Sequence, residues 1–347
     1  MFKDERIVKL GDYIETQSGG TPNTKKSEYY EGGNIPWLSS GEVNQGYIDE
    51  TEKFITSAGL ENSSAKWSPE DSVVIAMYGA TAGKVGYLNI PTTTNQAVCT
   101  LLPCDSFVPK FLYYAVSNKS SWMVSQCQGA AQPNISQGII KKMDIPMPKI
   151  TLQEKFVEVV EQADKSKFDC IKSRFIEMFK SESHSVALED IVEIKDDCRK
   201  PINDGTRSTM KDGELFPYYG ATGVVDHINQ FLTDEQLLCI AEDCGNYAAG
   251  EESSYIINGK AWVNNHAHVV KLKESCDINY LHHYLKIIDL MPYVSGTTRL
   301  KLTQKKLKEI PVILPEKSKQ IEFVTVVEQA DKSKSEERNE FFSRILN

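Results

Sequence analysis

The feature that most constrains this chain is a segment that occurs twice. The residues FVEVVEQADKSK at 156–167 return as FVTVVEQADKSK at 323–334, with eleven of twelve positions identical at an offset of 167 residues in a chain of 347. A repeat at a fixed period determines the architecture before any other pattern, because each copy belongs to an equivalent structural unit. The sequence therefore predicts two similar halves.

Weaker similarities recur at roughly the same period. KLGDYIE (9–15) parallels ALEDIVE (187–193), IPW (35–37) parallels FPY (216–218), and Asn95-Gln96-Ala97 parallels Asn265-His266-Ala267. Tyr-Gly-Ala-Thr also occurs in both halves, at 78–81 and at 219–222, but at different places within them. We therefore expect the order domain, helix, domain, helix, with boundaries at 1–150, 151–183, 184–317 and 318–347.

The repeated segment is predicted to be a helix because its apolar residues recur at steps of three and four. Prolines at 146, 148, 311 and 315 lie just upstream and indicate that neither helix has begun there. A helix over 152–182 would be about 45 Å long. The predicted interface between the helices consists of Phe156, Val160, Ala163, Phe175, Phe323, Val327, Ala330 and Phe342.

A narrow apolar stripe is typical of a coiled-coil seam. If the two nearly identical helices pair antiparallel, a pseudo-twofold axis relates the two halves, and the domains lie at opposite ends of a rod. The alternative is a helical hairpin that only stabilises each domain. That alternative does not explain why the helices stayed alike while the domains diverged.

The domains combine short strands, helices and many loops. Strand-like runs occur at 72–77, 98–102, 237–241 and 267–272, among turns rich in Gly, Asn, Ser and Thr, and helical stretches occur at about 108–121 and 278–290. The predicted fold class is α+β, with two loop-rich α/β domains separated by two long helices.

The loops carry polar side chains suited to DNA. Asn and Gln pair with adenine, Arg pairs with guanine, and backbone N–H groups at glycines approach phosphates. Each loop taken alone is better explained as an ordinary solvated turn, so the interpretation depends on the number of such loops and on their recurrence in both halves. The candidate DNA-binding residues are Ser18, Gly19, Thr21, Lys25, Lys26, Tyr78, Thr81, Lys84, Thr93, Asn95, Gln96, Gln132, Asn134, Lys200, Arg207, Tyr219, Thr222, Asn246, Asn265, His266, Thr298, Arg299, Lys301 and Lys305.

A basic stretch at 299–308 has five positive charges and no acidic residue. Its counterpart at 135–142 ends in two lysines. Such a stretch is either a solvated helix face or a helix that contacts phosphates.

The net charge of −9 restricts how DNA could be bound. The four predicted segments carry −2, −1, −5 and −1, so no domain is basic overall. DNA contact would therefore use local patches, and a partner would supply further phosphate contacts. The eight cysteines form no C-x-x-C pair and are interpreted as buried free thiols, with metal ligation the alternative. No apolar run is long enough to span a bilayer and the N-terminus is too polar for a signal peptide, so we expect a cytoplasmic protein.

Catalytic motifs are absent from the sequence. It contains no G-x-x-x-x-G-K-[ST], H-E-x-x-H or G-x-S-x-G pattern. Asn34-Ile35-Pro36-Trp37 is superficially similar to the N-P-P-[YFW] loop of amino-methyltransferases, but Ile35 replaces the first proline. The six histidines form no persuasive cluster. We therefore expect a binding protein without a catalytic site, a metal or a cofactor of its own.

Three segments carry a resemblance to a known family. KMDIPMPKITLQEKF leads into the first helix, KLGDYIETQSGGTP lies at the start, and IPWLSSGEV is followed by Tyr78-Gly79 and Asn95-Gln96. Over essentially its whole length the chain resembles the specificity subunits of type I restriction–modification systems. The second domain departs from that pattern, because it lacks S-G-G-T-P and has PYYGATG at 217–223.

The resemblance implies a DNA-binding subunit of a prokaryotic restriction system. Each target-recognition domain would read one half of a bipartite, asymmetric target, and the helices would set the spacer. Two modification (methyltransferase) subunits would dock and bring S-adenosylmethionine, and restriction/translocase subunits would use ATP and Mg. Two other classes of protein are the alternatives. An acidic mimic of DNA would have dense Asp/Glu tracts, and an unrecognised enzyme acting on sugars or peptides would need a residue spacing that the second domain lacks.

Overall fold

The computed structural model describes residues 6–127, 134–182, 185–244, 246–296 and 300–330. They form two compact units that meet in sequence between Val160 and Glu161, and each unit is described by itself. No helix among the described residues is both long and apolar enough to cross a membrane.

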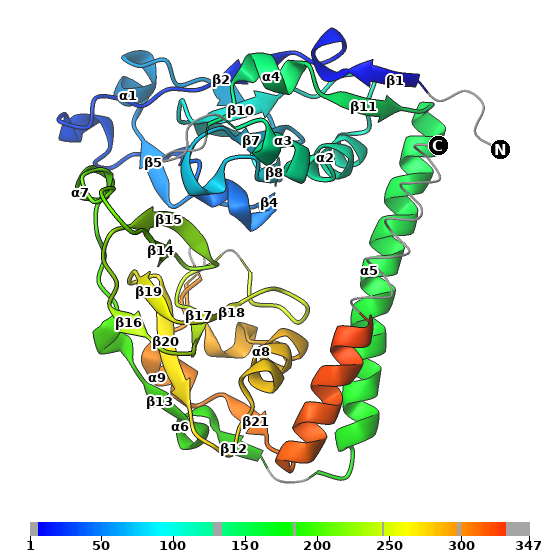
Figure 1. Cartoon of the computed structure of the whole chain (residues 1–347), viewed down its shortest axis with the longest axis vertical. Helices are drawn as coiled ribbons and strands as arrows, with labels where there is room; N and C mark the ends of the chain where they lie inside the picture. The colour runs from blue at the N-terminus through cyan, green and yellow to red at the C-terminus, as the bar shows by residue number, and fades with distance from the viewer. Residues whose placement is uncertain (1–5, 128–133, 183–184, 245, 297–299, 331–347) are drawn as a thin grey trace. The chain divides into compact units, whose positions relative to one another are not determined.

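Unit 1 contains three small sheets, with strand orders β1-β11, β2-β10-β7-β8-β4 and β5-β3-β9-β6. Figure 1 labels the strands of the first two sheets. The strands are β1 (Arg6–Lys9), β2 (Thr16–Ser18), β3 (Ile35–Leu38), β4 (Tyr47–Ile48), β5 (Lys53–Ile55), β6 (Trp67–Ser68), β7 (Val73–Ala76), β8 (Val85–Leu88), β9 (Thr92–Thr94), β10 (Val98–Leu101) and β11 (Asp144–Met147). The helices are α1 (Ser57–Glu61), α2 (Pro109–Ser117), α3 (Ser120–Ser125), α4 (Gln137–Lys141) and the first part of α5 (Ile150–Phe179), which continues into unit 2 after Val160.

Unit 2 repeats this arrangement, with strand orders β12-β21, β13-β20-β17-β18 and β15-β14-β19-β16. The strands are β12 (Ser185–Ala187), β13 (Val192–Ile194), β14 (Phe216–Tyr219), β15 (Val224–Ile228), β16 (Thr233–Asp234), β17 (Leu237–Ala241), β18 (Ser254–Ile257), β19 (Lys260–Val263), β20 (Ala267–Leu272) and β21 (Pro311–Ile313). The helices are α6 (Leu188–Ile191), α7 (Asp204–Ser208), α8 (Ile278–Ile287) and α9 (Gln304–Lys308), and residues 317–330 are also helical.

The topological match supports the weak sequence repeats. IPW lies on β3 and FPY on β14, and each of these strands pairs parallel with the strand that precedes the Asn-Gln-Ala or Asn-His-Ala segment, β9 or β19. The two Tyr-Gly-Ala-Thr segments are not equivalent, because one follows β7 and the other follows β14. The two halves are therefore copies of one three-sheet fold, in agreement with the predicted α+β class.

The predicted strands are confirmed to within one residue, but the single helix expected over 108–121 is wrong. The chain forms two helices there, and α2 ends before Asn118. The hydroxyl of Ser120 donates to the Gly83 carbonyl at 2.9 Å, so the second helix is held against the loop that follows β7.

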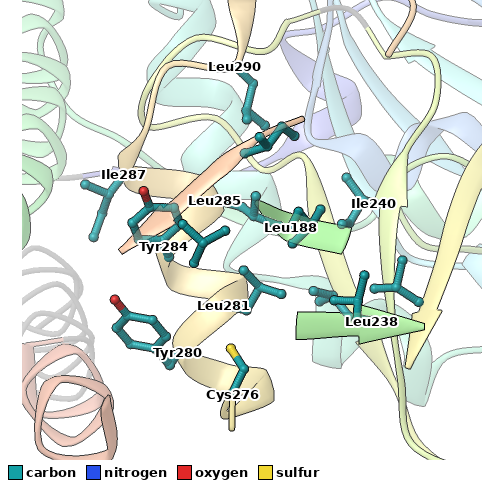
Figure 2. Close-up of a cluster of buried hydrophobic side chains, with 14 of the residues drawn as sticks. Leu188, Leu238, Ile240, Cys276, Tyr280, Leu281, Tyr284, Leu285, Ile287 and Leu290 are labelled. Carbon is teal, nitrogen blue, oxygen red and sulfur yellow. The ribbon is translucent and has the colours of Figure 1, made fainter. Parts of the chain in front are cut away.

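The core of unit 2 lies between β17, α8 and the long helices. Figure 2 shows Leu281 and Leu285 of α8 pointing towards Leu238 and Ile240 of β17, with Tyr280 on another side of the helix. The ring of Tyr280 contacts Phe179 and Phe323, at centroid distances of 6.0 and 6.1 Å. The apolar residues of the long helices therefore pack into the domain as well as against each other.

The second half of α5 and helix 317–330 run antiparallel within unit 2. The ring of Phe175 lies 5.3 Å from that of Phe323, and Lys319 forms an ion pair of 2.6 Å with Glu182. Further along, Val327 and Ile171 line the same cavity. Residue numbers therefore rise along one helix as they fall along the other, which is the pattern of an antiparallel pair.

The residues of the predicted seam contact the domains as well as the other long helix. Phe156, Val160, Phe175, Phe323 and Val327 are buried, whereas Ala163 and Ala330 are half-buried. The ring of Phe156 contacts Phe111 of α2, at 5.4 Å, so this member of the predicted seam packs against its own domain. Phe342 lies outside the described residues.

Candidate nucleic-acid interface

In unit 1 the loops that follow β7 and β9 converge with two other segments. The hydroxyl of Thr21 donates to the Gln96 side chain, Met77 N donates to the Ala97 carbonyl at 2.7 Å, and Tyr78 bridges to Asn134. These loops lie close together because β7 pairs with β10, and the loop after β9 leads directly into β10. The exposed candidates at this edge, called edge 1, are Thr21, Tyr78, Lys84, Gln96 and Asn134.

Two glycines allow the segment before Thr21 to reach edge 1. A Cβ atom on Gly19 would lie 1.8 Å from the Thr94 carbonyl oxygen, and one on Gly20 would lie 2.4 Å from the Ser64 hydroxyl. Gly20 N donates to the Thr94 carbonyl at 2.9 Å, and Nε1 of Trp37 donates to the Gly20 carbonyl at 3.0 Å. The glycines in S-G-G-T-P are therefore needed for close backbone packing.

A buried carboxyl group supports the loop after β3. Glu42 is 2% exposed and accepts hydrogen bonds from Ser39 N, Ser39 Oγ and Glu52 N, each at 2.7 Å. Burial, followed by the charge of Glu52, raises its pKa to about 7. The adjacent Ser40 carbonyl accepts a hydrogen bond from Thr81, so the loop that Glu42 holds contacts the loop after β7.

Some candidates in unit 1 have structural roles. Thr81 and Thr93 are buried, and their hydroxyls donate to the Ser40 and Pro36 carbonyls at 2.9 and 2.7 Å. Both residues were predicted to contact DNA, whereas in the structure both hydroxyls are committed to packing the loops. Asn95 is half-buried, and its side-chain oxygen accepts from Ala97 N at 3.0 Å.

The remaining candidates of unit 1 differ in exposure. Ser18 is half-buried on β2, whereas Lys25 and Lys26 are exposed. Lys26 Nζ donates to the Tyr29 hydroxyl at 3.0 Å, and that hydrogen bond is the main cause of its raised pKa. Gln132 lies outside the described residues.

The equivalent loops of unit 2 also converge. Asn264 N donates to the Tyr219 carbonyl at 3.0 Å, Glu242 N to the His266 carbonyl at 2.9 Å, and Leu302 N to the Glu242 carbonyl at 2.8 Å. Lys200 N joins the group through the Val263 carbonyl. The exposed candidates at this edge, called edge 2, are Lys200, Thr222, Asn246, Asn265 and Lys301.

Edge 2 contains an ion-pair network. Arg199 pairs with Asp196, at 3.1 Å, and with Glu242, and it also donates to the Asn265 and Ala267 carbonyls. Lys301 adds a 2.9 Å ion pair to Glu242. Burial opposes ionisation of Glu242, but hydrogen bonds from Lys301 and Arg199 outweigh it and lower its pKa.

Two histidines extend this network. His266 Nδ1 lies 2.9 Å from Asp243, whereas His268 is buried between the Asp196 carboxylate and the Leu302 carbonyl, both at 2.8 Å. Burial raises the pKa of Asp196, but hydrogen bonds from His268, Val269 N and Gln304 outweigh it and leave the pKa lowered. The network joins the segments that follow β13 and β17 to the start of β20 and to the segment before α9.

Two candidates of unit 2 make contacts within the unit itself. Arg207 lies over the Tyr218 ring, 4.7 Å from its centroid, and its Nε is 3.6 Å from Asp226. Its guanidinium is therefore engaged inside the unit. Tyr219 stacks on Tyr255 with centroids 5.3 Å apart, and burial raises its pKa. Thr298 and Arg299 lie outside the described residues.

The basic stretch ends in the short helix α9, which begins after Thr303 because its hydroxyl caps the first turn. Lys305 and Lys306 are exposed, and Lys306 forms an ion pair of 2.8 Å with Glu309. That hydrogen bond lowers the pKa of Glu309. Lys305 is consequently the better candidate for a phosphate contact.

Sequence reasoning missed the acidic and basic residues that organise edge 2. Arg199, Glu242 and Asp243 were not among the candidates, although Glu242 and Asp243 directly follow the strand run LLCIA. Their position at a strand end was the available signal. Among the described residues, no group of three His, Cys, Asp or Glu side chains is placed to hold a metal ion.

Comparison with protein families gives one matching model. The type I restriction modification DNA specificity domain matches residues 3–177 and again residues 180–340. The two matches together cover most of the chain.

Curated proteins and solved structures give related matches. The chain is 34% identical over 141 residues to a putative type I restriction enzyme specificity subunit of Haemophilus influenzae, which covers 41% of this chain and 35% of that protein. It is 28% identical over 170 residues to the EcoR124I/EcoR124II specificity subunit of Escherichia coli, with 47% and 42% covered. The matched part thus spans less than half the length of either relative. The crystal structure of a type I restriction–modification S subunit from M. genitalium aligns at 15% identity and a TM-score of 0.37, covering 99% of this chain and 93% of that one.

Proposed function

The chain belongs to the type I restriction modification DNA specificity family, and we propose that each of its units reads one half of a bipartite, asymmetric DNA target. The observation that carries this proposal is the repetition of one three-sheet topology with unlike side chains at the equivalent edge. Edge 1 exposes Gln96 between β9 and β10, where edge 2 exposes Asn265 beside a half-buried His266. One fold with two different surfaces fits two different half-sites.

The exposed groups at both edges suit base and phosphate contacts. Gln96 and Asn265 carry amides, which pair bidentately with adenine. Lys84, Lys200 and Lys301 carry positive charges that would face phosphates. At edge 2 the charge of Lys301 is partly offset by Glu242, so the net attraction for DNA there is weaker than the number of lysines indicates.

The long helices would set the unspecified spacer between the half-sites. Helix α5 starts in unit 1 and pairs with helix 317–330 in unit 2. A longer or shorter α5 would therefore change the distance between the two recognition edges. The exposed apolar residues Val159, Ile176 and Ile321 on these helices would meet the modification subunits.

The chain itself would be non-catalytic within a prokaryotic cytoplasmic enzyme complex. Partner subunits would bind S-adenosylmethionine for adenine methylation, and the restriction/translocase subunits would use ATP and Mg. A basic surface on those partners would compensate for the net charge of −9 on this chain. An acidic DNA mimic is disfavoured, because the acids at edge 2 are paired with Arg199, Lys301 and His266.

The direct test is genome-wide sequencing of adenine methylation in a host that carries the modification subunits, with and without this chain. We expect one bipartite motif with two unlike halves to be methylated only when the chain is present. Methylation that does not depend on the chain would contradict the proposal.

A matched pair of variants assigns each half of the motif to a unit. Gln96→Ala should relax one half of the motif, at a discrimination cost of about 1–3 kcal/mol, and Asn265→Ala should relax the other half. If both variants altered the same half, the assignment of one half-site to each unit would be wrong.

A further inference from the structure

Gln153 and Gln320 occupy equivalent places 167 residues apart, and both side chains are fully buried. Gln153 lies in the first turn of α5, and Gln320 lies at the equivalent point of helix 317–330. In each unit the residue three positions later is the seam phenylalanine, Phe156 or Phe323. The repeat therefore includes a Q-x-x-F pattern at the start of each long helix.

Both glutamines make the same three hydrogen bonds. Gln153 Nε2 donates to the Pro148 carbonyl at 2.8 Å and to the Ser106 carbonyl at 3.1 Å, and its Oε1 accepts from Val108 N at 2.8 Å. In unit 2 the corresponding partners of Gln320 are the Pro315 carbonyl at 2.8 Å, the Ser275 carbonyl at 3.0 Å and Asp277 N at 2.8 Å.

These partners join two helix starts. Val108 and Asp277 are the N-cap residues of α2 and α8, and the two proline carbonyls lie just before the long helices. One amide group thus connects the first turn of a long helix with the first turn of a domain helix. The Phe156–Phe111 and Phe323–Tyr280 ring contacts lie one turn further along the same pairs of helices.

We propose that Gln153 and Gln320 are positioning residues, which hold each recognition domain at a defined angle to its long helix and thereby set the spacer that the complex accepts. The inference rests on the proposed function, because it concerns how the two half-sites are measured. An apolar contact such as Phe156–Phe111 tolerates sliding, whereas three short hydrogen bonds in a buried site restrict the direction of the side chain. Without them the domain would remain attached by its apolar contacts but would rock on its helix.

The range of spacer lengths that the complex accepts is sensitive to such movement of the domain on its helix. One base pair moves a half-site by about 3.4 Å and rotates it by about 35°, since the duplex repeats in 10–10.5 base pairs. If the domain is held rigidly on its long helix, the complex rejects a target whose spacer is one base pair too long or too short. If the domain can move on the helix, the complex accepts such a target.

The test compares Gln153→Met with Phe156→Leu in the assembled complex with its modification subunits. Gln153→Met keeps the side-chain length and removes all three hydrogen bonds, whereas Phe156→Leu weakens the packing and keeps those bonds. Methyl transfer is measured on duplexes with the native spacer and with spacers one base pair longer or shorter. We expect Gln153→Met to lower the preference for the native spacer by about tenfold without changing the recognised bases, while Phe156→Leu retains it. Equal preference in both variants would overturn the inference.

A second measurement on the full chain needs no DNA. Spin labels are introduced through noncanonical amino acids at Asn118 in unit 1 and at Asp169 on α5, both exposed. Gln153→Met should broaden the distribution of distances between the labels, and Phe156→Leu should not. An unchanged distribution contradicts the positioning role. If no bipartite target exists, the proposed function fails in the methylation assay, and this measurement still decides the role of Gln153.

Discussion

The ring of Phe175 lies 5.3 Å from that of Phe323, at an interplanar angle of 76°, and this edge-to-face contact joins the two long helices. Phe323 is the first residue of the second copy of the repeat, equivalent to Phe156, whereas Phe175 lies just after the first copy. The contact therefore joins the second copy to the helix segment that follows the first. Such a contact is the expected consequence of antiparallel pairing between two similar helices.

Removing either ring should destabilise unit 2. Phe175→Ala and Phe323→Ala should each lower the free energy of unfolding by about 3–5 kcal/mol, because both rings are buried. In a double-mutant cycle we expect a coupling of about 0.5–1.5 kcal/mol beyond the loss of area. Ile176→Ala is the control, since Ile176 is 57% exposed. Strict additivity of the two phenylalanine substitutions would show that the ring contact contributes nothing specific.

Lengthening the helices should change the spacer and leave the half-sites alone. A heptad inserted after Lys167, with the same heptad after Lys334, keeps the apolar stripe in phase and adds about 10.5 Å, close to three base pairs. We expect methylome sequencing to show a longer spacer between unchanged halves. A four-residue insertion is the comparison, because it rotates the stripe out of register. A change in the recognised bases would rule out the helices as the spacer device.

Lys305 should contribute to DNA affinity without contributing to specificity. Lys305→Ala should weaken binding about equally for all sequences and reduce the slope of log K against log salt by about one. Lys306→Ala should have a smaller effect, because Lys306 already pairs with Glu309. Lys273→Ala serves as the control, since its Nζ donates to the Asp190 carbonyl beyond the other end of β20. An unchanged salt slope for Lys305→Ala would remove α9 from the interface.

The stability of unit 1 should fall as pH rises, through Glu42. Its pKa is about 7 in the folded chain and 4.5 for an ordinary glutamate, so the folded state binds more protons between these values. The free energy of unfolding should therefore decrease by about 1–3 kcal/mol between pH 4.5 and pH 7. Hydrogen exchange of β3 and β9 peptides along a urea titration reports this for unit 1 alone.

Glu42→Gln should abolish that pH dependence. The exposed Glu70→Gln in the same unit should keep it, which controls for the general loss of negative charge. If the free energy of unfolding of the Glu42→Gln variant still decreased with pH, another group in unit 1 would be responsible.

Much of the architecture could be predicted from the sequence because it depends on periodicity. The copy at 323–334 required two equivalent units, and the prolines upstream located the start of both helices. The strands of 237–241 and 267–272 were predicted with their observed bounds, since apolar runs of this length form buried strands. The break between α2 and α3 was missed, because the Ser120–Gly83 hydrogen bond that accompanies it joins residues far apart in sequence.

The sequence by itself determined the duplication, the fold class and the start of the long helices, because these depend on the order of residue types along the chain. Only the tertiary structure decided which polar side chains are exposed at the edges. Thr93 and Arg207 are of residue types that commonly contact DNA. In the structure the Thr93 hydroxyl donates to the Pro36 carbonyl, and the Arg207 guanidinium lies over the Tyr218 ring. The same holds for Gln153, whose partners Ser106 and Val108 lie more than forty residues away. A hydrogen bond depends on distance and direction in space, and those are settled when the distant segments pack together.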